Sequence, residues 1–311
     1  MHQTTDTILM IRPVSFRMNE QTAVNNYFQE NLEIKNAEIN LKAQQEFDAF
    51  VDKLRAVGIT VIVENDDELM DTPDSVFPNN WVSFHANGDI AIYPMFAENR
   101  RKERREEVFM RLEAEGFIIE NIVDYTSAED EGVFLEGTGS LLLDRVNSKA
   151  YCALSPRADE DLFIEFCEDF EYTPVVFTAN QTLNGSRLPI YHTNVMMCLA
   201  ETFSVICLDT IDDKKERKNV VKHLKQDGKE IISITESQMH QFAGNMLQLR
   251  GKNNQHYLVM SKAAHDSLMP SQIKTIEKHC PILSSSLEII ETCGGGSARC
   301  MMAEVFLPKK L

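Results

Sequence analysis

Gly294-Gly295-Gly296-Ser297-Ala298-Arg299-Cys300 is the stretch from which the rest of the chain can be understood. Three consecutive glycines form a loop that other groups can approach closely and whose amides can face a developing anion. Cys300 stands at the exit of this loop, where an apolar run begins. A cysteine is a strong nucleophile as a thiolate, which nearby positive charge such as Arg299 or a protonated histidine stabilises. Taken alone, the stretch fits a catalytic thiol or a small buried residue beside a flexible turn.

Short polar blocks of this kind recur four more times along the chain, each followed by an apolar strand. One residue from each block can be taken as equivalent, and the set is Asn80, Gly139, Asn194, Asn245 and Cys300, with spacings of 59, 55, 51 and 55 residues. A near-constant period indicates one supersecondary unit that is copied along the chain. After each block we expect a strand, a turn, a second strand, an amphipathic helix and a third strand.

The hydrophobic pattern places these elements at definite positions. We predict second strands at 89–93, 150–154, 203–208 and 256–260, helices at 99–115, 157–170, 212–226 and 265–279, and third strands at 117–123, 174–177, 230–234 and 282–290. The N-terminal part supplies a strand at 7–13, a helix at 41–57 and a strand at 59–63. Between the first two lies an Asn- and Gln-rich stretch, at about 14–40, which we interpret as a long functional loop.

The two ends of the chain complement each other. The fifth unit has its block and first strand near the C-terminus, whereas the N-terminal strand, helix and strand have no block. We therefore predict an α/β fold in which five ββαβ-type units form a closed ring with five-fold pseudosymmetry, as a single domain spanning 1–311. Pairing of the N-terminal strand with the last unit would remove an exposed sheet edge. The alternative is an open α/β sheet whose regular spacing is a coincidence.

Composition excludes several classes of function. With 31 Lys and Arg against 48 Asp and Glu, the net charge of -17 disfavours nucleic acid and anionic membrane surfaces as partners. The sequence has no apolar run of membrane-spanning length and no leader pattern, so we expect a cytoplasmic protein. Seven cysteines without a Cys-x-x-Cys pair argue against a disulfide framework and a structural zinc site.

If the five blocks face one central cavity, they bring a nucleophile, a histidine and a carboxylate together as Cys300, His192 and Glu136. In such a set the histidine moves protons, while the carboxylate fixes the histidine's tautomer or orients the substrate. Each residue also has a simpler interpretation: His192 as a satisfied core histidine and Glu136 as a solvated charge at a strand end. Their occurrence at equivalent points of the period favours catalysis.

The blocks resemble those of the guanidino-group-modifying enzymes, or penteins, over nearly the whole chain. The resemblance rests on the glycine loop with Cys300, on His192-Thr193-Asn194 and on Glu136-Gly137. It implies a five-fold α/β propeller around a central active-site cavity and a hydrolase that uses no metal or organic cofactor. Within the superfamily the chain looks similar to amidinotransferases and dimethylarginine dimethylaminohydrolases, and most similar to citrulline-utilising hydrolases.

Two further segments match the branch similar to dimethylarginine hydrolases, namely Asn99-Arg100-Arg101-Lys102-Glu103 and Ser155-Pro156-Arg157. In that branch the arginines that match Arg100 and Arg157 bind the α-carboxylate of the substrate, and the resemblance implies the same roles here. For Arg100 the alternative is an ordinary charged helix start.

The departures from the family pattern concern two amides. Guanidine-processing members usually have a carboxylate where this chain has Asn80, and deiminases have another where it has Asn194. A guanidinium offers only donors and pairs well with carboxylates, whereas a neutral ureido group has both donors and an acceptor, which asparagine can match. We therefore expect citrulline as substrate, with ornithine, ammonia and carbon dioxide as products formed through an S-carbamoyl enzyme.

We expect the substrate to contact residues of these same blocks and segments: Phe77, Asn79, Asn80, Arg100, Arg157, Asn194, Gly296 and Ser297. Other functions stay open at this stage. They are a dimethylargininase, an arginine deiminase-like hydrolase, an amidinotransferase, and a binding protein that shares the pentein ring without its chemistry. The expected partner is a small-molecule amino acid, and the sequence leaves a homodimer open.

Overall fold

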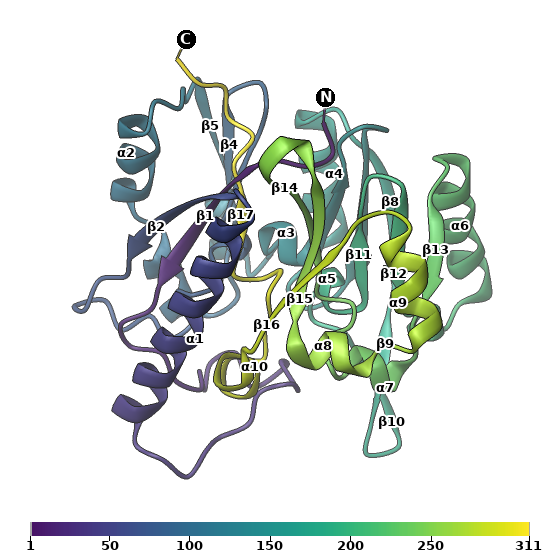
Figure 1. Cartoon of the computed structure of the whole chain (residues 1–311), viewed down its shortest axis with the longest axis horizontal. Coiled ribbons are helices and arrows are strands. Elements are labelled where there is room, and N and C mark those ends of the chain that lie inside the picture. Colours follow the sequence, from purple (N-terminus) through teal and green to yellow (C-terminus); the bar gives the residue numbers. More distant parts are fainter. Residues whose placement is uncertain (1, 311) are drawn as a thin grey trace.

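Five three-stranded sheets and one two-stranded hairpin make up the β-structure of residues 2–310, the part of the chain that the computed structural model describes (Figure 1). In sheet order, the three-stranded sheets are β3 (Val82–Phe84), β4 (Asp89–Ile92) and β5 (Asn121–Asp124); β6 (Leu141–Asp144), β7 (Lys149–Leu154) and β8 (Thr173–Thr178); β11 (Met197–Leu199), β12 (Phe203–Ile206) and β13 (Glu230–Ser233); β14 (Leu247–Arg250), β15 (His256–Ser261) and β16 (Ile282–Ser285); and β17 (Ala303–Glu304), β1 (Thr7–Arg12) and β2 (Thr60–Asn65).

All five sheets share one strand pattern. The first and second strands pair antiparallel, and the second and third strands pair parallel. Parallel neighbours need a crossover connection, which is usually helical. The crossovers are α1 (Asn36–Ala56); η2 (Glu98–Glu103) with α2 (Glu106–Ala114); α4 (Glu160–Asp169); α6 (Lys214–Gln226); and α8 (Lys262–Ser267) with α9 (Pro270–Glu277). The predicted α/β fold class is confirmed, whereas a five-fold axis that relates the sheets stays a prediction.

The first helix shows why the sequence forms these crossovers. In α1 the buried side chains recur three or four residues apart, so one apolar face packs on the strands beside it: Ile39, Ala43, Phe47, Phe50, Val51 and Leu54. Gly58, with φ of +85°, follows the helix in a backbone conformation that other residues rarely adopt. The helix begins at Asn36, five residues earlier than predicted.

The N-terminal strand lies between the last strand and the second one. Ile8 and Leu9 of β1 pair with Glu304 and Ala303 of β17, and the whole of β1 runs parallel to β2. In Figure 1 the purple strand β1 accordingly lies beside the yellow strand β17. Segments from the two ends of the chain thus form one sheet, directly after the loop that carries Cys300.

Three of the polar blocks form single buried turns of helix at the start of their sheets. These are η1 (Pro78–Asn80), α3 (Gly137–Ser140) and α5 (Thr193–Met196), and α3 packs against both of the others. Glycine makes this close packing of backbones possible. A Cβ on Gly137 would collide with the carbonyl oxygen of Asn79, and one on Gly244 would collide with that of Val195. The blocks from different repeats are therefore brought together in the interior.

Several predicted boundaries were wrong. The strand predicted at 282–290 ends at Ser285, and its second half belongs to helix α10 (Glu288–Gly294), whose first amides at Ile289 and Ile290 donate to the Glu46 carboxylate. The helix predicted at 265–279 is split before Pro270, which occupies the first turn of α9.

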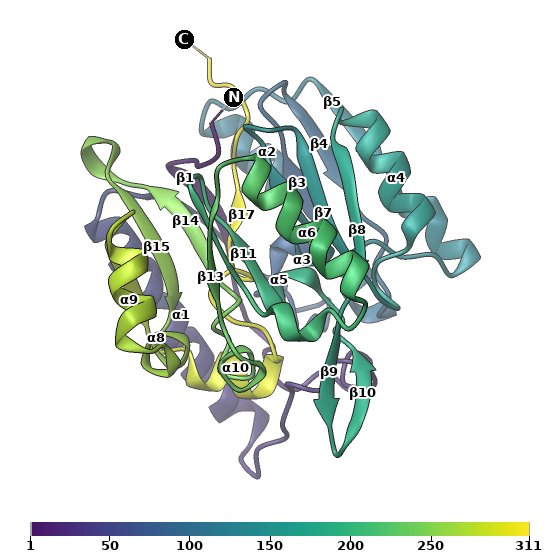
Figure 2. The same ribbon diagram turned by 90° about the vertical axis from the view of Figure 1, so that its right-hand side faces the viewer.

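The helix predicted at 99–115 likewise divides, into η2 and α2. The hairpin β9 (Asn180–Leu183) and β10 (Ser186–Pro189) was not predicted, and Figure 2 shows it projecting beyond the sheets. Among residues 2–310, none of the helices has the length and apolar character that crossing a membrane requires.

Candidate active site

Cys300 is buried at the end of the glycine loop, with only 3% of its surface exposed. Its sulfur lies 3.2 Å from Nδ2 of Asn245 and 3.5 Å from Nδ2 of Asn194. The turn that carries Cys300 is closed by a hydrogen bond from its N–H to the carbonyl of Ser297, at 3.0 Å. Arg299 points elsewhere, since its guanidinium donates to the carbonyl of Met302 at 2.8 Å. The immediate environment of the sulfur is therefore neutral and rich in amide donors.

His192 and Glu136 form a buried pair, with His192 Nε2 2.7 Å from Glu136 Oε2. Burial would raise the pKa of Glu136, but Arg157, His192 and Arg100 lower it, so that the net pKa lies below the usual range. Burial lowers the pKa of His192 to about 4, against the opposing effect of the carboxylate. The pair is thus a neutral imidazole and a carboxylate at neutral pH. Because an ionised carboxylate only accepts, Nε2 carries the imidazole proton and Nδ1 is the free base.

Gly139 explains how two blocks approach each other at this pair. A Cβ at that position would lie 2.8 Å from His192 Nδ1 and still closer to Asn80 Nδ2. No other amino acid leaves room for both groups, so glycine in the second block brings the amide of the first block next to the imidazole of the third.

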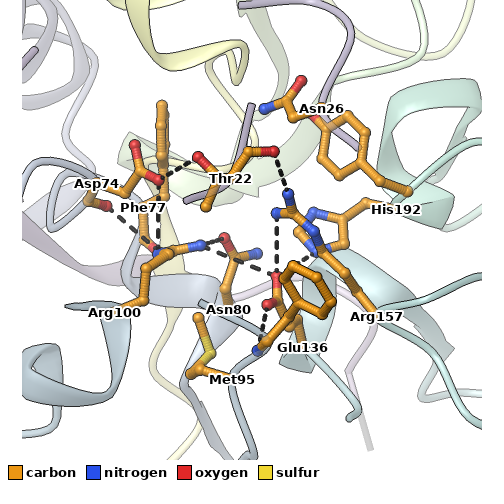
Figure 3. Close-up of polar contacts among 12 residues, drawn as sticks. Thr22, Asn26, Asp74, Phe77, Asn80, Met95, Arg100, Glu136, Arg157 and His192 are labelled. Atoms are coloured by element: carbon orange, nitrogen blue, oxygen red, sulfur yellow. Dashed lines mark hydrogen bonds and ion pairs between the residues drawn. The ribbon is translucent and has the colours of Figure 1, made fainter. Parts of the chain in front are cut away.

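Arg100 is buried and almost fully occupied by protein partners. Its Nε and Nη2 each donate to the Glu103 carboxylate at 2.9 Å, and its Nη1 donates to Asn80 Oδ1 at 2.7 Å. Figure 3 shows Arg100 between Asp74 and Asn80, facing Glu136. The Glu136 carboxylate lies 4.0 Å away. This network fixes Asn80 with its oxygen toward Arg100, so its amino group is directed away from that arginine, and Nδ2 has no hydrogen-bond partner.

Arg157 is the second buried arginine, and the loop between β1 and α1 covers it. Its Nε donates to Asn25 Oδ1 at 2.9 Å, and its Nη2 donates to the carbonyl of Thr22 at 2.9 Å. Its Nη1 is 3.5 Å from Glu136, and the guanidinium lies 5.0 Å from the centre of the Tyr191 ring. Figure 3 shows Thr22 and Asn26 of this loop over the arginine and the histidine.

The same loop also holds the glycine loop. Asn26 Nδ2 and Gln29 Nε2 donate to the carbonyl of Gly294, at 3.2 and 3.1 Å. Between the two loops remains a cavity of only about 10 Å³. The two loops, the first and third blocks and the two arginine segments all contribute to its lining. The lining residues are Asn26, Asp74, Phe77, Asn80, Arg100, Arg157, Tyr191, His192, Gly294, Gly295, Gly296 and Cys300.

Most of the residues predicted from sequence line this cavity, and four do not: Asn194, Ser297, Asn79 and Glu136. Asn194 contacts the sulfur through its Nδ2, which also donates to the carbonyl of Thr138 at 3.4 Å. Ser297 is buried and donates its hydroxyl proton to Glu291 at 2.6 Å. Asn79 is buried without a hydrogen-bond partner for its amide, and its backbone oxygen accepts from Thr138. Glu136 reaches the cavity through His192.

Sequence reasoning did not assign four residues that the structure brings to the site. Asp74 lies three residues before Phe77, and one of its oxygens accepts from Asn19 and Thr22 while the other has no partner. Burial raises the pKa of Asp74, against the effect of Arg100. Tyr191 and Asn26 line the cavity, and Asn245 contacts the sulfur. Asn245 had a signal in the sequence as one of the five equivalent block positions, and Tyr191 directly precedes His192 in its block.

Metal binding has no support in the part of the chain that the structure describes. No three His, Cys, Asp or Glu side chains within residues 2–310 are placed to hold a metal ion. The donor set around the sulfur consists of amides, which are poor ligands for zinc. The site is therefore described by its nucleophile, its imidazole and its ion pairs.

Comparison with solved structures identifies the class of fold. ArgZ, an arginine dihydrolase from the ornithine–ammonia cycle in cyanobacteria, superposes with a TM-score of 0.73 at 16% identity, covering 98% of this chain and 41% of ArgZ. The N-terminal domain of ArgZ bound to substrate gives 0.69 at 15% identity, covering 97% of this chain and 99% of the domain. A dimethylarginine dimethylaminohydrolase adduct with S-methyl-L-thiocitrulline gives 0.63 at 13% identity, covering 97% and 99%.

The chain therefore has the pentein fold, as its sequence blocks indicate, and it spans about two fifths of the length of ArgZ. No curated protein matches its sequence. Residues 12–307 match the model of a family described as N,N dimethylarginine dimethylhydrolase, eukaryotic, and the chain belongs to this family. It is thus a hydrolase of carbon–nitrogen bonds within the guanidino-group-modifying superfamily, as the sequence analysis predicted.

Proposed function

We propose that this enzyme hydrolyses citrulline to ornithine, ammonia and carbon dioxide. The observation that supports this substrate is the neutral set of groups at the reacting end of the cavity. Asn194 and Asn245 donate to the sulfur, and Asn80 has a free amino group facing away from Arg100. A ureido oxygen can accept from such an amino group, whereas a guanidinium, which only donates, cannot.

The charged side of the cavity, which adjoins Asn80 through Arg100, suits the amino-acid part of the substrate. Arg100 and Arg157 are buried cations, and Asp74 has an oxygen without a partner. Arginine is suited to bidentate recognition of carboxylates, and a carboxylate is suited to an ammonium group. We assign the substrate α-carboxylate to the arginines, Arg157 in particular once Asn25 and Thr22 release it, and the α-amino group to Asp74.

The first half of the reaction forms a covalent intermediate. Cys300 gives its proton to His192 Nδ1, and the sulfur attacks the ureido carbon. The bond between that carbon and the side-chain nitrogen of ornithine then breaks, and His192 returns the proton to the departing amine. Glu136 stabilises the imidazolium that exists between these two proton transfers, through the bond from Nε2. The product left on the enzyme is an S-carbamoyl cysteine.

The second half regenerates the thiol. His192 Nδ1 takes a proton from water, which attacks the carbamoyl carbon, and the carbon–sulfur bond breaks as Cys300 regains a proton. Carbamate leaves and decomposes to ammonia and carbon dioxide. AgrE, of which this chain covers 40%, has been solved with ornithine and NAD+, so a protein that contains this fold binds the amine that we propose as product.

The main rival is a guanidinium substrate. The description of the family names dimethylarginine as substrate, ArgZ is an arginine dihydrolase, and a mutant of AgrE has been solved with L-arginine. In that case Glu136 and Asp74 alone would have to balance the guanidinium, although Glu136 is already paired with His192 and Arg157. Arginine dihydrolysis would give the same ornithine, so the two reactions are separated by substrate preference.

Asn80→Asp tests the assignment. The new carboxylate keeps the acceptor for Arg100 and replaces the free amino group with an anionic oxygen. We expect kcat/KM for citrulline to fall about tenfold or more, because the ureido oxygen then faces an anionic acceptor in place of an amino donor. The same carboxylate should favour a guanidinium, so the ratio of kcat/KM for citrulline to that for arginine or methylarginine should fall further than kcat/KM for citrulline alone.

Asn80→Ala is the matched control, since it removes the amide without adding charge and should weaken citrulline turnover without helping arginine. Wild-type preference for arginine or methylarginine, or an unchanged ratio in Asn80→Asp, would show that the citrulline assignment is wrong. Ammonia and ornithine release, measured over this substrate panel, give the required constants.

The remaining expectations from sequence are part of the same proposal. We propose that residues 1–311 act as one catalytic domain on a small-molecule amino acid, without a metal or organic cofactor. All seven cysteines are free in the described residues, which supports a reducing compartment such as the cytoplasm.

A further inference from the structure

The sulfur of Cys300 is in contact with two amide side chains from neighbouring repeats, Asn194 and Asn245. Both amides are buried, so their contacts do not compete with bulk water. Within the described part of the chain, no other side chain forms a hydrogen bond with this sulfur. The Cys-His-Glu set explains Cys300 but gives no role to these amides.

The orientation of the Asn245 amide is fixed by its other partners. Its Oδ1 accepts from the N–H of Arg299 at 2.9 Å, and its Nδ2 donates to the carbonyl of Asn194 at 3.1 Å. A flipped amide would set donor against donor and acceptor against acceptor. The amino group therefore faces the sulfur, at 3.2 Å.

Asn194 presents the same kind of group. Its Nδ2 lies 3.4 Å from the carbonyl of Thr138 and 3.5 Å from the sulfur, whereas its Oδ1 is 3.8 Å from the sulfur. A neutral thiol needs an acceptor for its proton, and a thiolate needs donors. Two donors at the shorter distances and one acceptor at the longest distance fit a thiolate better than a thiol.

We infer that Asn245, together with Asn194, is a catalytic residue that stabilises the Cys300 thiolate by donating hydrogen bonds to its sulfur. The inference rests on the proposed function only in taking Cys300 as the nucleophile. Hydrogen bonds to the charged form of a group favour that form. The cation next in sequence does not supply this stabilisation, because the Arg299 guanidinium binds the carbonyl of Met302 and the carboxylate of Glu304, at 2.8 and 2.9 Å.

The amides also determine where the thiol proton goes. When the S–H bond breaks, the sulfur keeps the electron pair and the proton forms an N–H bond at His192 Nδ1. Burial disfavours an imidazolium on its own, as the lowered pKa of His192 shows. A thiolate held by two donors lowers the cost of that transfer and leaves the proton on the group that later protonates the departing amine. Asn245 thus acts in the step that creates the nucleophile.

Asn245→Asp tests this role, because it keeps the acceptor for Arg299 and replaces the amino group with an anionic oxygen. The rate of alkylation of Cys300 by iodoacetamide is measured against pH, with the labelled residue identified by mass spectrometry. We expect the pH of half-maximal rate to rise by about one to two units relative to wild type, so that alkylation near neutral pH slows about tenfold or more. The limiting rate at high pH should stay close to that of wild type.

The chain offers a matched control on strand β14, which begins two residues after Asn245. Gln248, three residues further on, is buried and donates its Nε2 to the sulfur of another cysteine, Cys280, at 3.5 Å. Gln248→Glu introduces the same change at a sulfur that takes no part in the reaction, and it should leave the alkylation profile of Cys300 unchanged. Asn245→Ser, which replaces the amide donor with a shorter hydroxyl and adds no charge, should move the profile in the same direction as Asn245→Asp but by less.

The inference is overturned if the profile of Asn245→Asp coincides with that of wild type, or if Gln248→Glu shifts it equally. If Asn245→Asp does not fold, as judged by thermal unfolding, the profile of Asn245→Ser decides in the same way. Because the alkylation assay contains no substrate, its result is independent of the citrulline assignment. A shifted profile in an enzyme that prefers arginine would retain the inference and reject the substrate.

Discussion

The two ends of the active-site cavity differ in how they handle charge. At one end, Arg100 and Arg157 are buried in a network of ion pairs with Glu103, Asp74 and Glu136. At the other end, the sulfur of Cys300 is in contact with uncharged amides. Buried charges are tolerated when they are paired, whereas amides add donors without adding net charge.

The difference shows how one small cavity can select a substrate. Under the proposed function, the charged end binds the zwitterion common to all amino acids and contributes affinity and orientation. A neutral end distinguishes what lies at the far tip of the side chain, because a cation there would find no free carboxylate. Discrimination between citrulline and arginine is therefore expected to depend on few residues, and the expected effects of mutations differ between the two ends.

The largest effect is expected at the neutral end, from Cys300→Ser. A serine hydroxyl is far less acidic than a thiol, so turnover should fall by at least about a thousandfold while the fold persists. Ammonia release and thermal unfolding measure the two properties. Cys293→Ser, in helix α10, is the matched control and should retain activity, and a loss of activity there would show that the wrong sulfur was assigned.

A smaller effect is expected at the charged end, from Arg157→Lys. Lysine keeps the charge but not the planar fork, so KM for citrulline should rise about tenfold or more. N-carbamoylputrescine, which has the ureido group but no α-carboxylate, should be turned over equally by both enzymes. Arg187→Lys, at the surface arginine that binds Asp212 and Glu236, is the control. An equal loss on both substrates would remove Arg157 from carboxylate recognition.

The smallest effect concerns the pair that links the two ends. The pKa of His192 is about 4 in the folded protein, below the ordinary 6.5, so the unfolded chain binds the additional proton more readily. Stability should therefore fall as pH decreases from about 6.5 to 4, by about 1 kcal/mol per pH unit. Denaturant unfolding of wild type and His192→Gln isolates this contribution as the difference between the two curves. Parallel curves through that window would contradict the assignment.

Much of the fold could be predicted because the period and the hydrophobic pattern are local properties of the sequence. Strands β4, β7 and β13 and helix α6 lie within two residues of their predicted ranges. The errors occurred where tertiary contacts decide the structure. The segment after Ser285 is apolar enough for a strand, but Glu46 of a distant helix binds its first amides and α10 forms.

The candidate site shows the same limit. Cys300, His192 and Glu136 stand within three residues of equivalent points of the period, so sequence spacing was sufficient to bring them together as a prediction. Asp74 has no such position: it lies in the turn before η1, where its carboxylate is 3.9 Å from Nε of Arg100. The contact of Asn25 with Arg157 joins residues far apart in sequence, and no pattern in an irregular loop indicates it.

Closure of the loop between β1 and α1 has a consequence for the lifetime of the enzyme. The cavity of about 10 Å³ has room for about one water molecule, so a substrate of amino-acid size can enter only when Thr22, Asn26 and Gln29 release their partners. An oxidant such as a peroxide also reaches the Cys300 sulfur only when this loop opens. The rate at which stored enzyme loses activity through oxidation should therefore depend on how often the loop opens. A bound product that keeps the loop closed should protect the Cys300 sulfur from oxidation.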